Sequence, residues 1–83
     1  MECVTAVKPL PDFQIEVAFD TGHVKIFDMK PYLGKGVFTR LRDTTVFNQA
    51  YIDYDTVCWP GNLDMAPDTL FDRGITVTYS STK

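Results

Sequence analysis

The alternation of apolar and polar residues predicts two β-hairpins. Residues 13–19 alternate between the two classes, which is the period of a half-buried strand. We expect Thr21-Gly22 to form a two-residue turn, with glycine supplying a positive φ. Facing Asp20 with His23 then sets Val17 opposite Ile26 and leaves Lys25 on the other face of the hairpin. A shift of one residue would bring Lys25 among the apolar side chains.

The second hairpin is expected around Asp55-Thr56, between residues 51–54 and 57–59. Pairing Tyr54 with Val57 sets Ile52 opposite Trp59 on one apolar face, and places Asp53 and Cys58 on the other. A further strand is expected at residues 3–8, ended by two prolines that remove amide donors. Residues 63–65 give one more alternating step.

Three segments have the spacing of short helices. Val37 and Phe38 lie four and three residues before Leu41, which predicts a short helix there. Asp43 is expected to be the N-cap of a second helical turn. A third helix, residues 67–72, would begin at Pro67 with Asp68 near the positive end of the helix dipole.

These elements predict an α+β fold: a small single domain of antiparallel hairpins, with about five short strands packed by two or three short helices. We place the domain at residues 1–72. Residues 73–83 alternate through Ile75, Val77 and Tyr79 before a polar end, so this tail is interpreted as an edge strand or a frayed end.

Charge is segregated along the 83 residues, whose net charge is -3. All the charged side chains of segment 29–42 are positive. Segment 43–72 carries six aspartates and no cation. This polarity could be satisfied within the chain, between subunits or by a partner. The acidic balance argues against a general nucleic-acid surface. The positive residues that form a candidate partner surface are Lys30, Lys35, Arg40 and Arg42.

The two cysteines, Cys3 and Cys58, lie far apart in apolar strand patterns, which favours reduced thiols over a disulfide. The first residues lack the basic start and apolar run of a signal peptide. No apolar run approaches the ~20 residues of a membrane span. We therefore expect a cytoplasmic protein that does not enter a membrane.

The order of these features resembles a small bacterial family known as domain of unknown function 2442. The resemblance runs through Val7-Lys8-Pro9-Leu10, the hairpin at Gly22, Pro31-Tyr32-Leu33 and Gly36-Val37-Phe38. Its most specific part is the segment with Trp59, Pro60, Gly61, Asp64, Pro67, Asp68, Leu70 and Phe71. It covers residues 2–72. The chain departs from the family at Gly61-Asn62, where Asn-Gly is frequent, at Phe71, where tyrosine is usual, and at Ala66, where a capping serine is common.

The resemblance implies a fold more than a function, because the family has no established activity. Some relatives look like halves of toxin-antitoxin gene pairs, and others carry a helix-turn-helix domain after this one. Residues 1–83 do not include that second domain, so direct DNA binding is not implied.

The residues themselves suggest little chemistry. His23 is the only histidine and lies beside a turn, and the two separated cysteines do not complete a zinc ligand set, so we expect neither metal nor cofactor. No cation or histidine near Cys58 in the sequence would activate its thiol. Gly34-Lys35-Gly36 lacks the frame of a phosphate-binding loop. Trp59 is interpreted as a core residue.

Three functional hypotheses remain open at this point. The first is a non-enzymatic interaction module that binds a protein partner or a second copy, as the antitoxin-like or regulatory half of a small-gene pair. The second is a small metal- or ligand-dependent enzyme that uses Asp53, Asp64 and Asp68. The third is a nucleic-acid-associated regulator that uses the four cations of segment 29–42.

Overall fold

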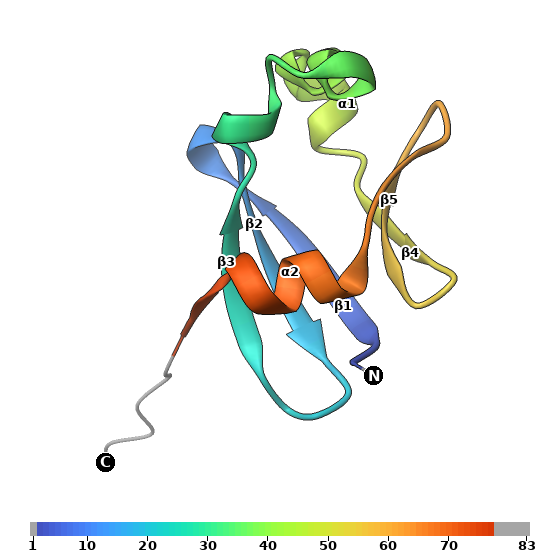
Figure 1. Ribbon diagram of the computed structural model, residues 1–83. Helices are drawn as coiled ribbons and strands as arrows, with labels where there is room; N and C mark the ends of the chain where they lie inside the picture. The colour runs from blue at the N-terminus through green and yellow to red at the C-terminus, as the bar shows by residue number, and fades with distance from the viewer. Residues whose placement is uncertain (1, 78–83) are drawn as a thin grey trace.

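Two antiparallel sheets and a set of short helices make up the fold of residues 2–77, which the computed structural model describes (Figure 1). Sheet A has the strand order β1-β2-β3-β7, and sheet B has the order β4-β5-β6. The fold is therefore α+β, with seven strands instead of about five. In chain order, with η marking 3-10 helices, the elements are β1 (Val4–Leu10), η1 (Pro11–Phe13), β2 (Gln14–Phe19), β3 (Val24–Asp28), η2 (Lys30–Tyr32), η3 (Gly36–Arg42), α1 (Thr44–Phe47), β4 (Tyr51–Asp53), β5 (Thr56–Trp59), β6 (Leu63–Met65), α2 (Pro67–Arg73) and β7 (Ile75–Thr76).

The β2–β3 hairpin has a three-residue loop, and the predicted two-residue turn is wrong. The Phe19 N–H donates to the His23 carbonyl at 2.9 Å, and the Gly22 N–H donates back to the Phe19 carbonyl at 3.0 Å. Gly22 has φ 92°, the left-handed position that closes such a loop with a bulge. The extra loop residue shifts the register by one, so Val17 lies opposite Lys25 and not opposite Ile26.

This shift places Lys25 on the core side of sheet A, where only 8% of its surface is exposed. Its Nζ donates a hydrogen bond to the carbonyl oxygen of Phe71 in α2 and lies 4.0 Å from the centroid of the Phe71 ring. The ammonium thus finds an acceptor and an aromatic face under the helix, which offsets the cost of burying it. Helix α2 and strand β3 are tied together by this one side chain.

The β4–β5 hairpin turns at Tyr54-Asp55, one residue earlier than predicted. Both residues have positive φ, 50° and 64°, as a two-residue hairpin loop of type I′ requires. Ile52 therefore lies opposite Val57, and Trp59 pairs with Leu63 of β6 instead. The register differs from the predicted one by two residues, and an even shift keeps every side chain on its predicted face.

The core lies between the two sheets and is centred on Trp59, which is fully buried. The Trp59 Nε1–H donates to the Phe47 carbonyl at 3.1 Å, and the two rings stack at 6.3 Å. A buried indole N–H needs such a partner. The other fully buried large side chains are Phe27, Phe47, Ile15, Met29, Leu41, Leu63, Leu70, Val17 and Val57.

The helices begin largely where the sequence indicates. Asp43 caps α1, since its Oδ1 accepts the Thr45 N–H at 2.9 Å. Pro67 opens α2, and its N-cap Ala66 supplies no side-chain hydrogen bond. The short helix predicted from the spacing of Val37, Phe38 and Leu41 is a 3-10 helix, in which Leu41 is buried and Val37 is 55% exposed.

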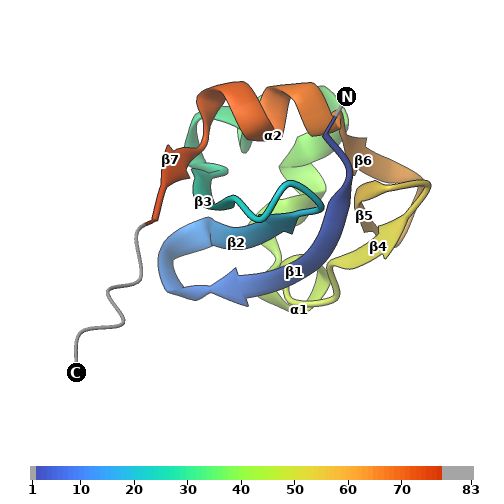
Figure 2. The ribbon, with the colours of Figure 1, turned by 90° about the horizontal axis from the view of Figure 1, so that it is seen from below.

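Helix α2 lies along one side of sheet A (Figure 2). It contacts that face through the edge-to-face pair of Phe71 with Phe19, whose centroids are 5.2 Å apart. After α2 the chain enters β7, which pairs with β3 as the edge strand of sheet A. Tyr79, which the sequence pattern also placed in the tail, lies outside the described residues, and the domain boundary at residue 72 stays a prediction.

Candidate functional site

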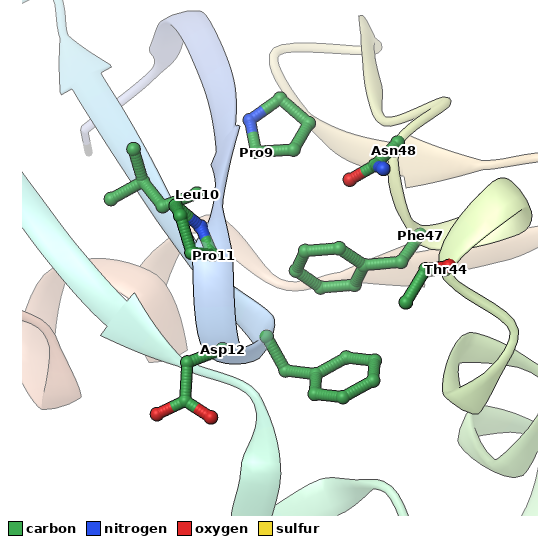
Figure 3. A pocket seen from close by; sticks show the side chains of 8 residues that line it. Pro9, Leu10, Pro11, Asp12, Thr44, Phe47 and Asn48 are labelled. Atoms are coloured by element: carbon green, nitrogen blue, oxygen red, sulfur yellow. The ribbon is translucent and has the colours of Figure 1, made fainter.

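A cleft of about 510 Å³ opens between the η1 turn and α1 (Figure 3). Its floor holds Phe13 and Phe47, whose rings meet edge to face with centroids 5.4 Å apart. Asp12 is the only charged group of its lining, which consists of Pro9, Leu10, Pro11, Asp12, Phe13, Thr44, Phe47 and Asn48. An apolar floor with a polar rim suits binding of an apolar group. None of the residues that the sequence indicated as site residues lines this cleft.

The cleft depends on an unusual backbone at η1. Asp12 and Phe13 both have left-handed φ, 66° and 59°, a conformation that costs free energy in residues other than glycine. The Lys30 Nζ holds this turn, because it donates to the Asp12 carbonyl and to Asp12 Oδ2, both at 3.0 Å, and lies 3.1 Å from Asp28 Oδ1. The hydrogen bonds that the Lys30 ammonium donates to the carboxylates of Asp12 and then Asp28 raise the pKa of Lys30.

The remaining cations of segment 29–42 also have partners within the protein. The Arg40 Nη1 donates to the Gly61 carbonyl at 3.0 Å, and the Arg42 Nε donates to the Leu33 carbonyl at 3.0 Å. The Lys35 ammonium lies 5.7 Å from the centroid of the Tyr32 ring. These contacts brace an irregular segment that has few ladder hydrogen bonds of its own. The structure therefore gives these side chains a folding role.

The three aspartates of the enzyme hypothesis are not brought together. Asp53 and Asp64 flank Cys58 on the outer face of sheet B, whereas Asp68 lies in the first turn of α2. Asp64 sits within β6, directly opposite Cys58 of β5. Within residues 2–77 no group of three or more potential metal ligands is assembled.

Cys58 is a poor nucleophile in this position. The thiol is buried, and its Sγ–H donates to the Asp53 carbonyl at 3.7 Å. Burial, then the charges of Asp64 and Asp53, raise its pKa above the ordinary value, so the reactive thiolate is disfavoured. Cys3 has a raised pKa for similar reasons: partial burial first, then Asp55 and Asp20. Both thiols are free.

The groups around Cys58 form an exposed surface on sheet B and its first turn. Tyr54 at the tip of the hairpin is 90% exposed, and Tyr51 on β4 is 45% exposed. Asp53, Asp55 and Asp64 are all exposed beside them, and the Asp53 Oδ1 accepts the Tyr54 N–H at 3.0 Å. We call these five residues the acidic tyrosine face; they contain no cation. The hairpin that carries most of them lies at the side of the domain (Figure 1), where the Val4 N–H of β1 donates to the Asp55 carbonyl at 2.9 Å.

Sequence reasoning named Asp53 and Asp64 but missed the two tyrosines. For Tyr51 the signal was available in the alternation of residues 51–54, because Tyr51 must point away from the face on which Ile52 is partly buried. For Tyr54 the alternation gave no such signal, because its exposure depends on the turn. The lining of the cleft carried no comparable signal. It depends on two left-handed residues at η1, neither of which is a glycine.

The residues of the specific Trp-Pro segment serve the backbone and the core. Gly61 has φ 92°, and Pro60 precedes it in the loop between β5 and β6, the order found in a type II turn. A side chain at Gly61 would also lie 2.5 Å from Arg40 Nη1. Leu70 is fully buried, and Phe71 covers Lys25.

The whole arrangement matches one family model, described as protein of unknown function (DUF2442), over residues 4–76. The chain belongs to this family. The expected resemblance is thus confirmed over all the described strands and helices of the fold. No curated protein and no solved structure matches the chain. Among the described residues, no helix is long and apolar enough to cross a membrane.

Proposed function

We propose that this DUF2442 domain is a non-enzymatic interaction module that binds a basic protein partner through the acidic tyrosine face. The observation that carries the proposal is the exposure of Tyr54, 90%, and Tyr51, 45%, beside three exposed aspartates. Tyrosine is enriched among the residues that dominate binding energy at protein interfaces, because it offers a large rigid surface with a polar end. A tyrosine at a hairpin tip contributes nothing to the core.

The negative charge of the face favours a basic partner. Its carboxylates can each accept two hydrogen bonds from an arginine guanidinium, whose plane can also stack on the tyrosine rings. A surface of one sign also accelerates the encounter with a partner of the opposite sign. Nucleic acid, with its dense negative charge, would be repelled by the same face. A partner rich in arginine is therefore the chemistry that fits.

In the cell, such a module would act as the antitoxin-like or regulatory half of a small-gene pair. A small domain that masks a basic surface on its partner would control that partner by occupying it. The segregated charges support this role, because cations of the basic segment 29–42 bind groups within the fold, while all six aspartates of segment 43–72 are exposed.

Affinity capture from the source cells with matched baits tests the proposal. One bait carries Asp53→Asn and Asp55→Asn on the acidic tyrosine face, and its control carries Asp68→Asn and Asp72→Asn on α2. Both baits lose two negative charges. We expect a basic protein to be retained by the wild-type and control baits, released by salt, and lost from the face variant. Equal retention by all three baits, or no protein retained above background, would overturn the proposal.

A further inference from the structure

A hollow of about 410 Å³ lies at the edge of sheet A, where β3 extends beyond the short strand β7. Its apolar lining includes Ile26, Phe27, Tyr32 and Ile75. Ile75 is 73% exposed, so an apolar wall is open to solvent here. A concave, largely apolar surface of this size suits a small molecule. The hollow lies at the opposite side of the domain from strands β4–β6 and the acidic tyrosine face (Figure 2).

Two side chains of opposite charge also line the hollow, Asp28 at the end of β3 and Arg73 at the end of α2. They do not pair with each other, because both ion pairs found within residues 2–77 are made by Lys30. The contacts of Lys30 with Asp28 use Oδ1, which accepts the Lys30 N–H at 2.9 Å and lies 3.1 Å from its Nζ. Asp28 Oδ2 and the Arg73 guanidinium therefore keep the capacity to bind a ligand.

The backbone of Asp28 is also open at this edge. The Val24 carbonyl accepts the Val77 N–H, and alternate residues of a strand direct their backbone groups to the same neighbouring strand. Ile26 and Asp28 therefore face the same edge as Val24, but β7 pairs no further along β3 than Ile26. The N–H and C=O of Asp28 are left beyond the end of β7, beside the hollow, where they can hydrogen-bond a bound molecule.

We propose that this hollow binds a free amino acid with an apolar side chain. The Arg73 guanidinium can donate two parallel hydrogen bonds to the carboxylate of the amino acid. Asp28 Oδ2 can accept a hydrogen bond from its ammonium. The apolar side chain would lie against Ile26 and Ile75 and remove their surface from water.

The pair of opposite charges favours a zwitterion over a ligand of one charge. A simple carboxylic acid would bind Arg73 but would bring its negative charge next to Asp28. An amine without a carboxylate would bind Asp28 but would leave Arg73 without a partner. Covering a charged group without pairing it costs free energy, so a ligand that carries both charges fits best. The site is separate from the acidic tyrosine face, and its test does not depend on the protein partner proposed above.

NMR titration of the ¹⁵N-labelled protein with phenylalanine and with leucine measures the binding. We expect saturable shifts at the amides of Asp28, Arg73 and Ile75. Two analogues test the charges separately at slightly acidic pH: N-acetylphenylalanine lacks the ammonium, and phenylalaninamide lacks the carboxylate. Each should bind about 10-fold or more weakly than phenylalanine, because a hydrogen bond to a charged group is lost. Glycine keeps both charges but has no side chain, and it should also bind more weakly.

Arg73→Gln tests the cation of the site. It should weaken the binding of phenylalanine about 10-fold or more and abolish the preference for phenylalanine over phenylalaninamide. Lys8→Gln is the matched control, since Lys8 is an exposed cation on β1, at the opposite edge of sheet A. It should bind phenylalanine as the wild type does.

An absence of saturable shifts with both amino acids would overturn the proposal. So would shifts centred on the cleft between η1 and α1, or a loss of binding in Lys8→Gln equal to that in Arg73→Gln. If Arg73→Gln fails to fold, the analogues decide the matter on the wild type. Binding of N-acetylphenylalanine or phenylalaninamide as tight as that of phenylalanine would then contradict the assignment.

Discussion

Truncation of Lys25 to alanine discriminates between the two possible registers of the β2–β3 hairpin. In the register expected from a two-residue turn, Lys25 lies in solvent and its loss costs little. In the structure, Lys25 is 8% exposed and reaches the Phe71 carbonyl and ring. Lys25→Ala should then destabilise the domain as a core substitution does.

The expected magnitude follows from what the substitution removes. Three buried methylenes contribute about 2.4 kcal/mol at about 0.8 kcal/mol each. A hydrogen bond from a charged donor adds about 1.5–3 kcal/mol. Loss of the side chain relieves about 2 kcal/mol of lysine rotamer entropy. The net cost is about 2–3 kcal/mol, which corresponds to a drop in Tm of about 8–24 °C for a domain of this size.

Urea unfolding followed by circular dichroism measures this difference. Lys8→Ala is the control, because Lys8 is an exposed lysine on the face of sheet A that points away from the core. This substitution should change the free energy of unfolding by less than about 0.5 kcal/mol. Lys25→Met, which keeps most of the apolar stem, should fall between the two. If Lys25→Ala costs no more than Lys8→Ala, the buried register is wrong.

Three further outcomes are expected. Ala66→Ser supplies the missing N-cap of α2 and should stabilise the domain by about 0.5–1 kcal/mol; an unchanged or lower Tm would contradict it. Asp64→Asn removes a negative charge that raises the pKa of Cys58, so the variant should hold more of the reactive thiolate. Iodoacetamide should then alkylate Cys58 faster than in the wild type at a pH just below the wild-type pKa. An unchanged rate would show that burial alone sets the reactivity of this thiol. For Asp28, burial alone would raise the pKa, but hydrogen bonds and charge from Lys30 outweigh it and lower the pKa. The stability that Asp28 contributes is present above the pKa of the unfolded state and is lost as the pH falls through the lower pKa of the folded state. Lys30→Gln should therefore move the midpoint of acid unfolding to higher pH. An unmoved midpoint would show that the ion pair does not contribute to stability in acid.

The sequence predicted elements whose signal is local. Asp43 as an N-cap and Pro67 as a helix start each depend on a few neighbouring residues, and the structure has both. The apolar strand pattern around Trp59 also predicted that this residue is buried, and the structure confirms it. Such signals do not depend on how strands pair.

Register was harder to predict because it depends on turn length. Gly22 fits the last position of either a two-residue or a three-residue loop. Both faces of β3 also carry apolar side chains, Val24 and Ile26 on one and Phe27 on the other, so the pattern does not decide between the two registers. At the second hairpin, Tyr54 and Asp55 both adopt left-handed conformations, although neither is the glycine that usually indicates such a turn. The exposed Tyr54 at that tip, and with it the acidic tyrosine face, follows from the turn.

The affinity of a captured basic partner for Tyr54→Ala tests the interaction surface most directly. Tyr54 is 90% exposed, so its truncation leaves the fold intact and removes only what the face offers to a partner. Truncating a dominant interface residue costs about 2 kcal/mol or more, which weakens binding about 30-fold. We expect that loss by isothermal titration calorimetry, with Val37→Ala binding as the wild type does. Binding by Tyr54→Ala within about two-fold of the wild type, a difference of about 0.4 kcal/mol, would contradict the assignment of this face.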